Sequence, residues 1–140
     1  MAQTKKKTAK KPDCIHVIGR RKTATARVRL YQKKGKIIVN NLPIDQYFPG
    51  ITAQKLYLEP LNLTNTQDRL SFTIKVQGSG KSSQLGAVIH GLSRALVNLD
   101  EENKQTLKKR GFLTRDSRMK ESRKVGTGGK ARRKKQSPKR

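Results

Sequence analysis

Residues 70–99 read LSFTIKVQ, then GSG, then KSSQLGAVIHGLSRALVNL. In the first part, apolar residues occupy every second position, which is typical of a strand with one buried face. In the third part they recur at three- and four-residue steps, so we expect a helix, capped by Ser82 or Ser83, that covers the apolar face of a sheet. The apolar stripe of this helix comprises Leu85, Val88, Ile89, Leu92, Leu96 and Leu99.

Other strands are expected in the N-terminal half. Residues 23–31, TATARVRLY, alternate small or apolar residues with polar ones that include Arg27 and Arg29. This pattern predicts a half-buried strand with a basic outer face. Residues 14–18 and 36–40 are short, apolar and β-prone. A Lys-Lys-Gly turn separates residues 23–31 from residues 36–40, which predicts that these two strands pair as a hairpin.

The remaining elements are helical. Residues 43–48 predict a short helical turn, and residues 52–58 a helix that begins at a Thr52 cap and ends before Pro60. Residues 100–109 begin with acidic side chains and end with basic ones, which suits the helix dipole, and Gly111 provides a left-handed stop. Strands combined with these helices predict an α+β fold, a small mixed sheet with helices packed on one face.

The charge is large and unevenly placed. The chain of 140 residues has 34 Lys and Arg against 9 Asp and Glu, a net charge of +25. Residues 36–107 are nearly neutral, with seven basic and six acidic side chains. Basic runs kept for solubility would explain a much smaller surplus. A near-neutral body with basic extensions indicates a nucleic-acid-binding protein. The surplus lies in residues 5–11, 20–34, 108–110 and 114–140.

Several other classes are disfavoured. The chain has no Trp, its basic runs lack interleaved apolar residues, and no stretch approaches the ~20 apolar residues of a membrane span, so we expect no membrane partner. Residues 1–11 have no apolar signal core, which argues against secretion. Cys14 is the single cysteine, and His16 and His90 lie far apart. We therefore expect no disulfide, no metal site and no cofactor. We interpret His90 as a surface residue, with contact to a phosphate as the alternative.

The segment from Gly78 to Ser82 (GSGKS) lies between a strand and a helix, where a phosphate-binding loop of a nucleotide hydrolase would lie. The full motif requires glycine at position 75, which is Lys75, and no catalytic set accompanies it. We therefore expect no enzymatic activity and no small-molecule substrate. Two interpretations remain: Lys81 and the helix N-terminus bind an RNA phosphate, or the glycines form a plain turn.

Three adjacent cations, Arg20, Arg21 and Lys22, precede the basic strand that carries Arg27 and Arg29. They cannot all be buried without partners, so they meet either water or phosphate. Arginine can grip a phosphate with two hydrogen bonds, and the neighbouring charges favour RNA contact. The aromatic residues form no exposed pair on one strand, so backbone and shape recognition fits better than base stacking.

These patterns divide the chain into three parts. We expect a disordered basic arm over residues 1–13, a globular RNA-binding body over residues 14–112 and an extended basic tail over residues 113–140. Fully stretched, residues 111–140 would span on the order of 90 Å. Such a reach suits penetration into a large RNA particle. The alternative is a general protein that compacts nucleic acid.

Specific stretches carry a resemblance to a known family. In order along the chain they are GRRKTA at 19–24 with ARV at 26–28, GKIIVN at 35–40, QLGAVIHGLSRAL at 84–96, LTRD at 113–116 with Arg118, KARR at 130–133 and the terminal Lys139 and Arg140. The chain resembles the ribosomal protein S-nine family, the ninth protein of the bacterial-type small subunit.

The resemblance implies a fold similar to the second domain of ribosomal protein S-five and a structural role in translation. It implies a place in the head of the small ribosomal subunit, beside other head proteins and bound to the 3′ domain of small-subunit ribosomal RNA. It also implies that Lys139 and Arg140 contact the anticodon stem-loop of peptidyl-site tRNA. A terminal arginine can pair with a phosphate without distinguishing one tRNA from another.

The tail departs from the family pattern, because KKQSP at residues 134–138 replaces the usual Ala-Pro-Gln-aromatic-Ser. The path of the tail therefore stays open. We see no transit peptide, so a bacterial cytoplasm and a plastid-encoded product are both consistent with the sequence. The predicted rRNA-binding residues are Arg20, Arg21, Lys22, Arg27, Arg29, Lys81, Arg94, Arg115, Arg118, Lys130, Arg132 and Arg133.

Overall fold

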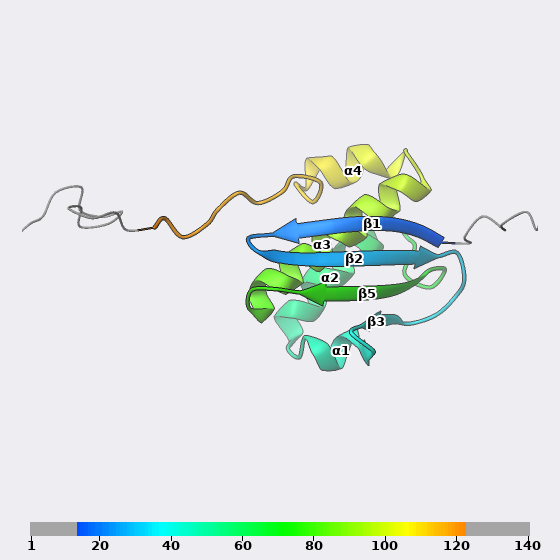
Figure 1. Cartoon of the computed structure of the whole chain (residues 1–140). Helices are drawn as coiled ribbons and strands as arrows, with labels where there is room; N and C mark the ends of the chain where they lie inside the picture. The colour runs from blue at the N-terminus through cyan, green and yellow to red at the C-terminus, as the bar shows by residue number, and fades with distance from the viewer. Residues whose placement is uncertain (1–13, 123–140) are drawn as a thin grey trace, which may run out of the picture.

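A five-stranded mixed sheet with helices packed on one face is the centre of the computed structural model, which describes residues 14–122 (Figure 1). This confirms the predicted α+β architecture. The order of strands across the sheet is β1-β2-β5-β3-β4. The strands are β1 (Cys14–Arg21), β2 (Ala24–Tyr31), β3 (Ile37–Val39), β4 (Leu42–Pro43) and β5 (Ser71–Gln77). The helices are α1 (Ile44–Tyr47), α2 (Ile51–Leu63), α3 (Lys81–Leu99) and α4 (Asn103–Lys109).

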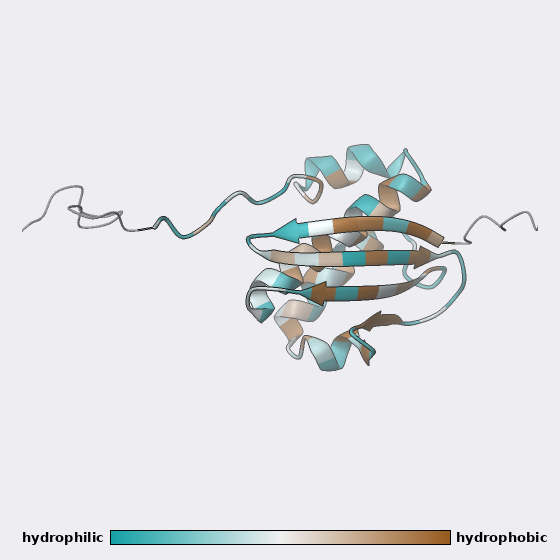
Figure 2. Cartoon of the chain, viewed as in Figure 1, coloured by the Kyte–Doolittle hydropathy of each residue, from teal (hydrophilic) through white to brown (hydrophobic). Residues whose placement is uncertain are grey.

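The three long strands keep the alternation read from the sequence. β2 pairs antiparallel with both β1 and β5, which places Val17, Val28 and Ile74 in one row across the sheet. All three side chains are buried beneath the helices. Figure 2 shows the resulting bands of apolar and polar residues along β2 and β5. One face of the sheet therefore builds the core, and the other is left uncovered.

The predicted hairpin between residues 23–31 and residues 36–40 is wrong. β3 pairs parallel with β5 and antiparallel with β4, so β5 lies between β2 and β3. β5 matches β2 over seven residue pairs, from Thr25 opposite Gln77 to Tyr31 opposite Ser71. β3 has only three residues, so it offers β2 far less pairing and burial than β5 does.

Two helices, α2 and α3, extend beyond the ends that local signals predicted. α2 contains Pro60, which we expected to stop it, and ends where the Thr64 hydroxyl bonds the Pro60 and Leu61 carbonyl oxygens at 3.0 and 3.2 Å. The proline ring is buried beside Tyr57, and this packing offsets the lost backbone hydrogen bond. Neither Thr52 nor a serine caps its helix, because Gly50 and Gly80 occupy the N-cap positions of α2 and α3.

A glycine contact joins β1 to the long helix α3. A Cβ added at Gly19 would overlap the Ala87 carbonyl oxygen and lie 2.7 Å from the Gly91 Cα. The strand and helix backbones therefore touch directly, with no side chain between them. This contact fixes the depth at which β1 lies on α3, and with it the position of the cationic residues that follow Gly19.

The chain returns to β1 after α4. α4 begins at Asn103 rather than at residue 100, and Gly111 follows it with a φ of 77°, which confirms the left-handed stop. Phe112 and Leu113 then pack against the core. Residues 114–116 consequently lie beside the β1–β2 hairpin, although they are about 90 residues away in the sequence.

Candidate nucleic-acid interface

The uncovered face of the sheet is cationic. Arg27 and Arg29 of β2 and Lys75 of β5 are exposed on it. Arg27 lies in register with Lys75 on one side and with Ile18 on the other. β1, β2 and β5 contain no acidic residue. Like charges on neighbouring strands repel one another. A bound polyanion would therefore reduce the electrostatic repulsion on this face.

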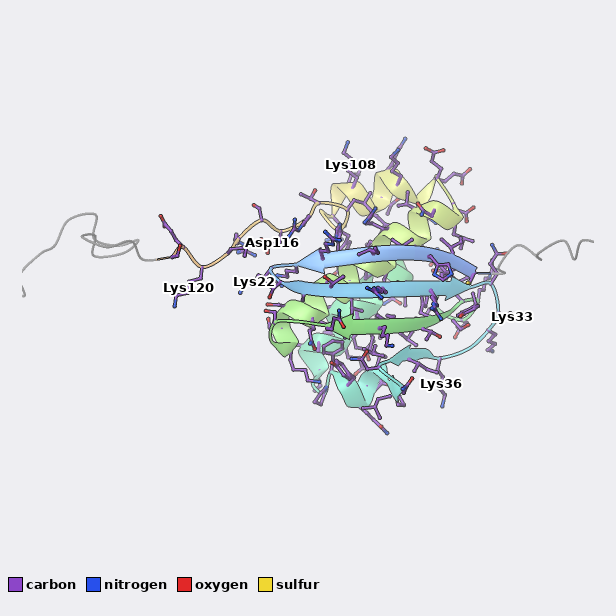
Figure 3. The ribbon with its side chains drawn as sticks, in the orientation of Figure 1. Lys22, Lys33, Lys36, Lys108, Asp116 and Lys120 are labelled. Carbon is purple, nitrogen blue, oxygen red and sulfur yellow. The ribbon has the colours of Figure 1, made fainter. Side chains whose placement is uncertain are left out.

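The structure brings several predicted RNA-binding residues together here. Arg20 is exposed on the same face as Arg27 and Arg29, and Lys22 lies at the tip of the β1–β2 hairpin (Figure 3). Lys75 was not predicted as a site residue, although its alternation with buried Ile74 and Val76 already pointed it outward. Only the pairing of β5 with β2 reveals that it stands beside Arg27.

Arg21 points to the other side of the sheet. Its side chain lies against Gly86 of α3, where an added Cβ would come within 2.8 Å of the Arg21 Nη1. The Arg21 Nη2 is 3.2 Å from the Asp116 Oδ2, an ion pair that no sequence pattern predicted. Arg21 therefore has a partner within the protein, in addition to the water or phosphate that the sequence indicated. Contact between Arg21 and rRNA stays a prediction.

Asp116 is the centre of a small charged cluster. Arg118 donates to it from Nε at 3.0 Å, from Nη2 at 2.8 Å and from its backbone N–H at 3.0 Å. Hydrogen bonds from the Arg118 side chain, then from its backbone, hold the pKa of the Asp116 carboxyl well below its usual range, and Arg21 contributes less. Asp116 is therefore ionised throughout the neutral range, and it links the segment after α4 to β1.

Lys81 is exposed at the start of α3, as predicted, but it has a partner within the protein. Its Nζ lies 3.4 Å from the centroid of the Tyr47 ring, a cation–π contact, and 3.4 Å from the Tyr47 carbonyl oxygen. The Tyr47 hydroxyl donates to Gln84 at 2.9 Å, which holds the ring in place. A phosphate at the GSGKS turn would meet a lysine already held over an aromatic ring.

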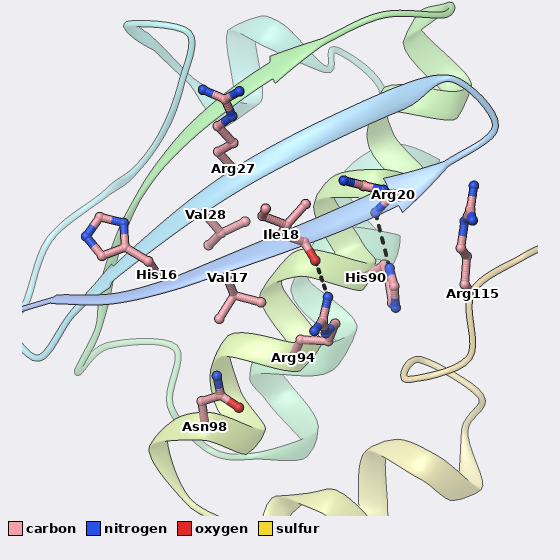
Figure 4. A pocket seen from close by; sticks show the side chains of 10 residues that line it. All are labelled: His16, Val17, Ile18, Arg20, Arg27, Val28, His90, Arg94, Asn98 and Arg115. Carbon is pink, nitrogen blue, oxygen red and sulfur yellow. Dashed lines mark hydrogen bonds between the residues drawn. The ribbon is translucent and has the colours of Figure 1, made fainter.

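A hollow of about 690 Å³ follows the outer edge of β1 (Figure 4). α3 fixes this edge, because the Arg94 Nη1 donates to the Ile18 carbonyl oxygen and the Arg20 backbone N–H donates to the His90 Nδ1 at 3.2 Å. Four arginines and no acidic residue surround the hollow. Its lining residues are His16, Val17, Ile18, Arg20, Arg27, Val28, His90, Arg94, Asn98 and Arg115.

His90 is half-buried and accepts a hydrogen bond from β1, a contact that its interpretation as a surface histidine did not include. The helical pattern placed it among polar neighbours, but β1 and Leu113 cover that side of α3. Burial lowers the pKa of the His90 imidazole, and the positive charges of Arg94 and Arg115 act in the same direction. The neutral ring accepts at Nδ1, so its remaining proton is on Nε2.

We expect His90 to make the folded state sensitive to mild acid. Because its pKa is lowered on folding, the unfolded chain binds a proton below about pH 6.5 that the native protein does not bind. The free energy of unfolding should therefore be fully retained above that pH and decline as the pH falls toward the folded pKa. Urea unfolding at pH 7.5 and 5.5 measures this decline.

His90→Asn is the matched control, because its amide oxygen can accept the Arg20 N–H but cannot titrate. His16 is unchanged in both proteins. Stability should fall less between the two pH values in His90→Asn than in the unmodified protein. An identical decline in both would contradict the assignment.

Of the remaining predicted site residues, two lie within the described part of the chain and the others lie outside it. Arg115 and Arg118 are exposed, on either side of Asp116. Residues 123–140, which include Lys130, Arg132, Arg133, Lys139 and Arg140, lie outside the described part of the chain. Within residues 14–122, no three His, Cys, Asp or Glu side chains gather as a metal site would require. The helices of this same stretch are too short or too polar to cross a bilayer.

Comparison with known families agrees with these features. The model of the family described as "Ribosomal protein S9/S16" matches residues 19–140, which is most of the chain. The match includes the end of β1 with Arg20, the whole of β2 with Arg27, the helix α3 and the segment that carries Arg115. Proteins of this family are structural components of the small ribosomal subunit that bind ribosomal RNA. The chain belongs to the ribosomal protein S9/S16 family.

Proposed function

We propose that this protein occupies the head of the small ribosomal subunit, beside other head proteins, and binds the 3′ domain of small-subunit rRNA. The uncovered cationic face of the sheet carries this proposal. It presents Arg20, Arg27, Arg29 and Lys75, and its three long strands bear no acidic side chain. The protein acts as a structural component without catalysis, in a bacterial cytoplasm or a plastid.

Recognition of the RNA backbone suits this surface. Guanidinium groups pair with phosphate through two parallel hydrogen bonds, and such contacts set position without reading the base sequence. The cations stand on paired strands, so their spacing is set by the sheet rather than by flexible loops. A fixed arrangement of positive charges of this kind favours one path of the RNA backbone over others.

The second part of the proposal concerns the tail. We propose that residues 113–140 run from the body toward the decoding region, where Lys139 and Arg140 contact the anticodon stem-loop of peptidyl-site tRNA. The support is the family resemblance, the density of positive charge in residues 130–140 and the length of the segment. One or two terminal cations can strengthen tRNA binding without selecting among tRNAs.

Deleting Lys139 and Arg140 should leave assembly intact and weaken peptidyl-site tRNA binding. Assembly is measured as co-sedimentation with small subunits after a moderately high-salt wash, and tRNA affinity by filter binding to the reconstituted subunits. Because the deletion leaves all of the proposed rRNA-binding residues in place, the truncated protein should co-sediment normally. We expect tRNA affinity to fall by roughly fivefold, on the order of 1 kcal/mol, because the deletion removes charge-assisted hydrogen bonds to the tRNA.

Lys134→Gln with Lys135→Gln is the matched control, because it removes two positive charges from the same tail and keeps its end. Equal tRNA affinity in the truncated and unmodified subunits would refute the tail contact. A protein that elutes in the wash and coats DNA instead would identify the alternative, a general compacting protein.

A further inference from the structure

Residues from three distant parts of the chain line the hollow at the edge of β1. Arg20 comes from β1, Arg94 from α3 and Arg115 from the segment after α4. Figure 4 shows these three side chains on different ribbons around the same stretch of β1. Within residues 14–122, none of the three forms an ion pair with Asp or Glu. Three guanidinium groups thus gather where the protein supplies no counter-charge.

One hydrogen bond and one neutral side chain make the hollow suitable for an anion. Arg94 uses one N–H to bond the Ile18 carbonyl oxygen, which orients the guanidinium and leaves its other donors available. His90 stays neutral because burial and the neighbouring arginines lower its pKa, so it adds no further positive charge to repel the three guanidinium groups. The Arg94 guanidinium is therefore oriented before any ligand arrives.

Asp116 sets the position of Arg115. The Asp116 Oδ2 lies 3.2 Å from the Arg21 Nη2, and the Arg21 side chain in turn lies against Gly86 of α3. Arg115 is the next residue toward the N-terminus and lines the hollow, whereas Asp116 lines the adjoining depression beside Gly86. The Arg21–Asp116 ion pair thus attaches the segment after α4 at the point that brings Arg115 opposite β1.

We infer that this hollow binds the sugar–phosphate backbone of RNA, through Arg20, Arg94 and Arg115, with Asp116 as a positioning residue. The inference rests on the proposed function and adds a second, discrete contact to the open sheet face. Ile18 and His16 lie at the rim of the hollow and also face outward from the sheet. An RNA strand on the open face can therefore continue over the edge of β1 into the hollow.

The test is equilibrium binding of the full chain to the 3′ domain of small-subunit rRNA, measured over a range of salt concentrations. Removing one phosphate contact should reduce the slope of log affinity against log salt by about 0.7 to 0.9. We expect this reduction in Arg94→Gln and in Arg115→Gln. Arg69→Gln is the matched control, because Arg69 is exposed beside Asp68, away from the hollow. It should change the slope far less.

Asp116→Asn separates positioning from general electrostatics. The substitution raises the net charge by one, so simple attraction to RNA predicts tighter binding. Release of Arg115 from its position predicts the opposite, weaker binding and a smaller slope. In the double variant Arg115→Gln with Asp116→Asn, the second change should then cause little additional loss. Thermal unfolding of each variant shows whether the fold is retained.

The outcomes are distinguishable from failure of the proposed function. If the unmodified protein binds this RNA but Arg94→Gln and Arg115→Gln behave as Arg69→Gln does, the site is refuted and the function stands. If Asp116→Asn binds as tightly as the unmodified protein or more tightly, Asp116 has no positioning role. Inorganic phosphate at constant ionic strength should not compete, and competition would identify a site for a free anion instead.

Discussion

Gly19→Ala should destabilise the protein by roughly 3 kcal/mol, the upper end of the range for overpacking a rigid site. The added methyl would overlap the carbonyl oxygen of Ala87 and crowd the Gly91 Cα at 2.7 Å. All of these neighbours are backbone atoms, so no side-chain rotation can relieve the overlap. The strand or the helix has to move, and the buried row that contains Val17 and Val28 would separate from α3.

Thermal unfolding of the full chain by circular dichroism measures this effect. A loss of this size should lower the Tm by more than about 10 °C in a domain of about 100 residues. Gly80→Ala is the control, since nothing lies within 4 Å of a Cβ at that position and its φ is −93°. We expect it to lower the Tm far less than Gly19→Ala does, since it affects only the N-cap of α3. If Gly19→Ala has the same Tm as Gly80→Ala, the close contact between β1 and α3 is disproved.

The loss of function should be greatest when the open sheet face is neutralised. The triple variant Arg27→Gln, Arg29→Gln and Lys75→Gln removes three exposed positive charges. These side chains are not part of the apolar core, so the fold should persist. At about 1 kcal/mol for each contact, the affinity for small-subunit rRNA should fall by roughly 100-fold. The salt slope should fall by about 2 to 3 in the same titrations, since three phosphate contacts are removed.

A charge-matched control is available within the nearly neutral part of the chain. Lys55, Arg69 and Lys104 are exposed and belong to α2, the loop before β5 and α4. Changing all three to Gln alters the net charge equally but leaves the sheet face intact. If both triple variants lose affinity to the same extent, total charge rather than the arrangement on the sheet governs binding. That result would remove the main support for the proposed rRNA-binding surface.

The local periodicity predicted most elements, because it reflects burial of one face and needs no knowledge of partners. The alternation in residues 70–77 and 23–31 became β5 and β2. Of the predicted apolar stripe of α3, Val88, Leu92 and Leu96 are fully buried, and the other three residues pack partly buried against the core. The charge distribution likewise indicated a polyanion partner before any fold was known. These properties depend on residue type and spacing alone.

Pairing and packing between distant segments could not be predicted in the same way. Nothing in the local sequence states that β5 inserts between β2 and β3, which is why the predicted hairpin failed. Pro60 continued its helix because the core buries its ring, a contribution absent from local propensity. The sequence predicts His90 at the surface because its neighbours on that side of the helix are polar. The residues that cover it, in β1 and at Leu113, are distant in the chain.

The residues of the candidate site can likewise be separated into those that the sequence predicts and those that only the fold brings together. The amino-acid sequence alone determined that arginines would stand on the outer side of one strand, since alternation and charge are both local properties. Only the tertiary structure decided that Lys75 joins them, that Arg21 turns inward to Asp116, and that Arg20, Arg94 and Arg115 surround one hollow. Strand order and helix docking bring these residues together over separations of about 50 to 95 positions, and no local pattern records such contacts.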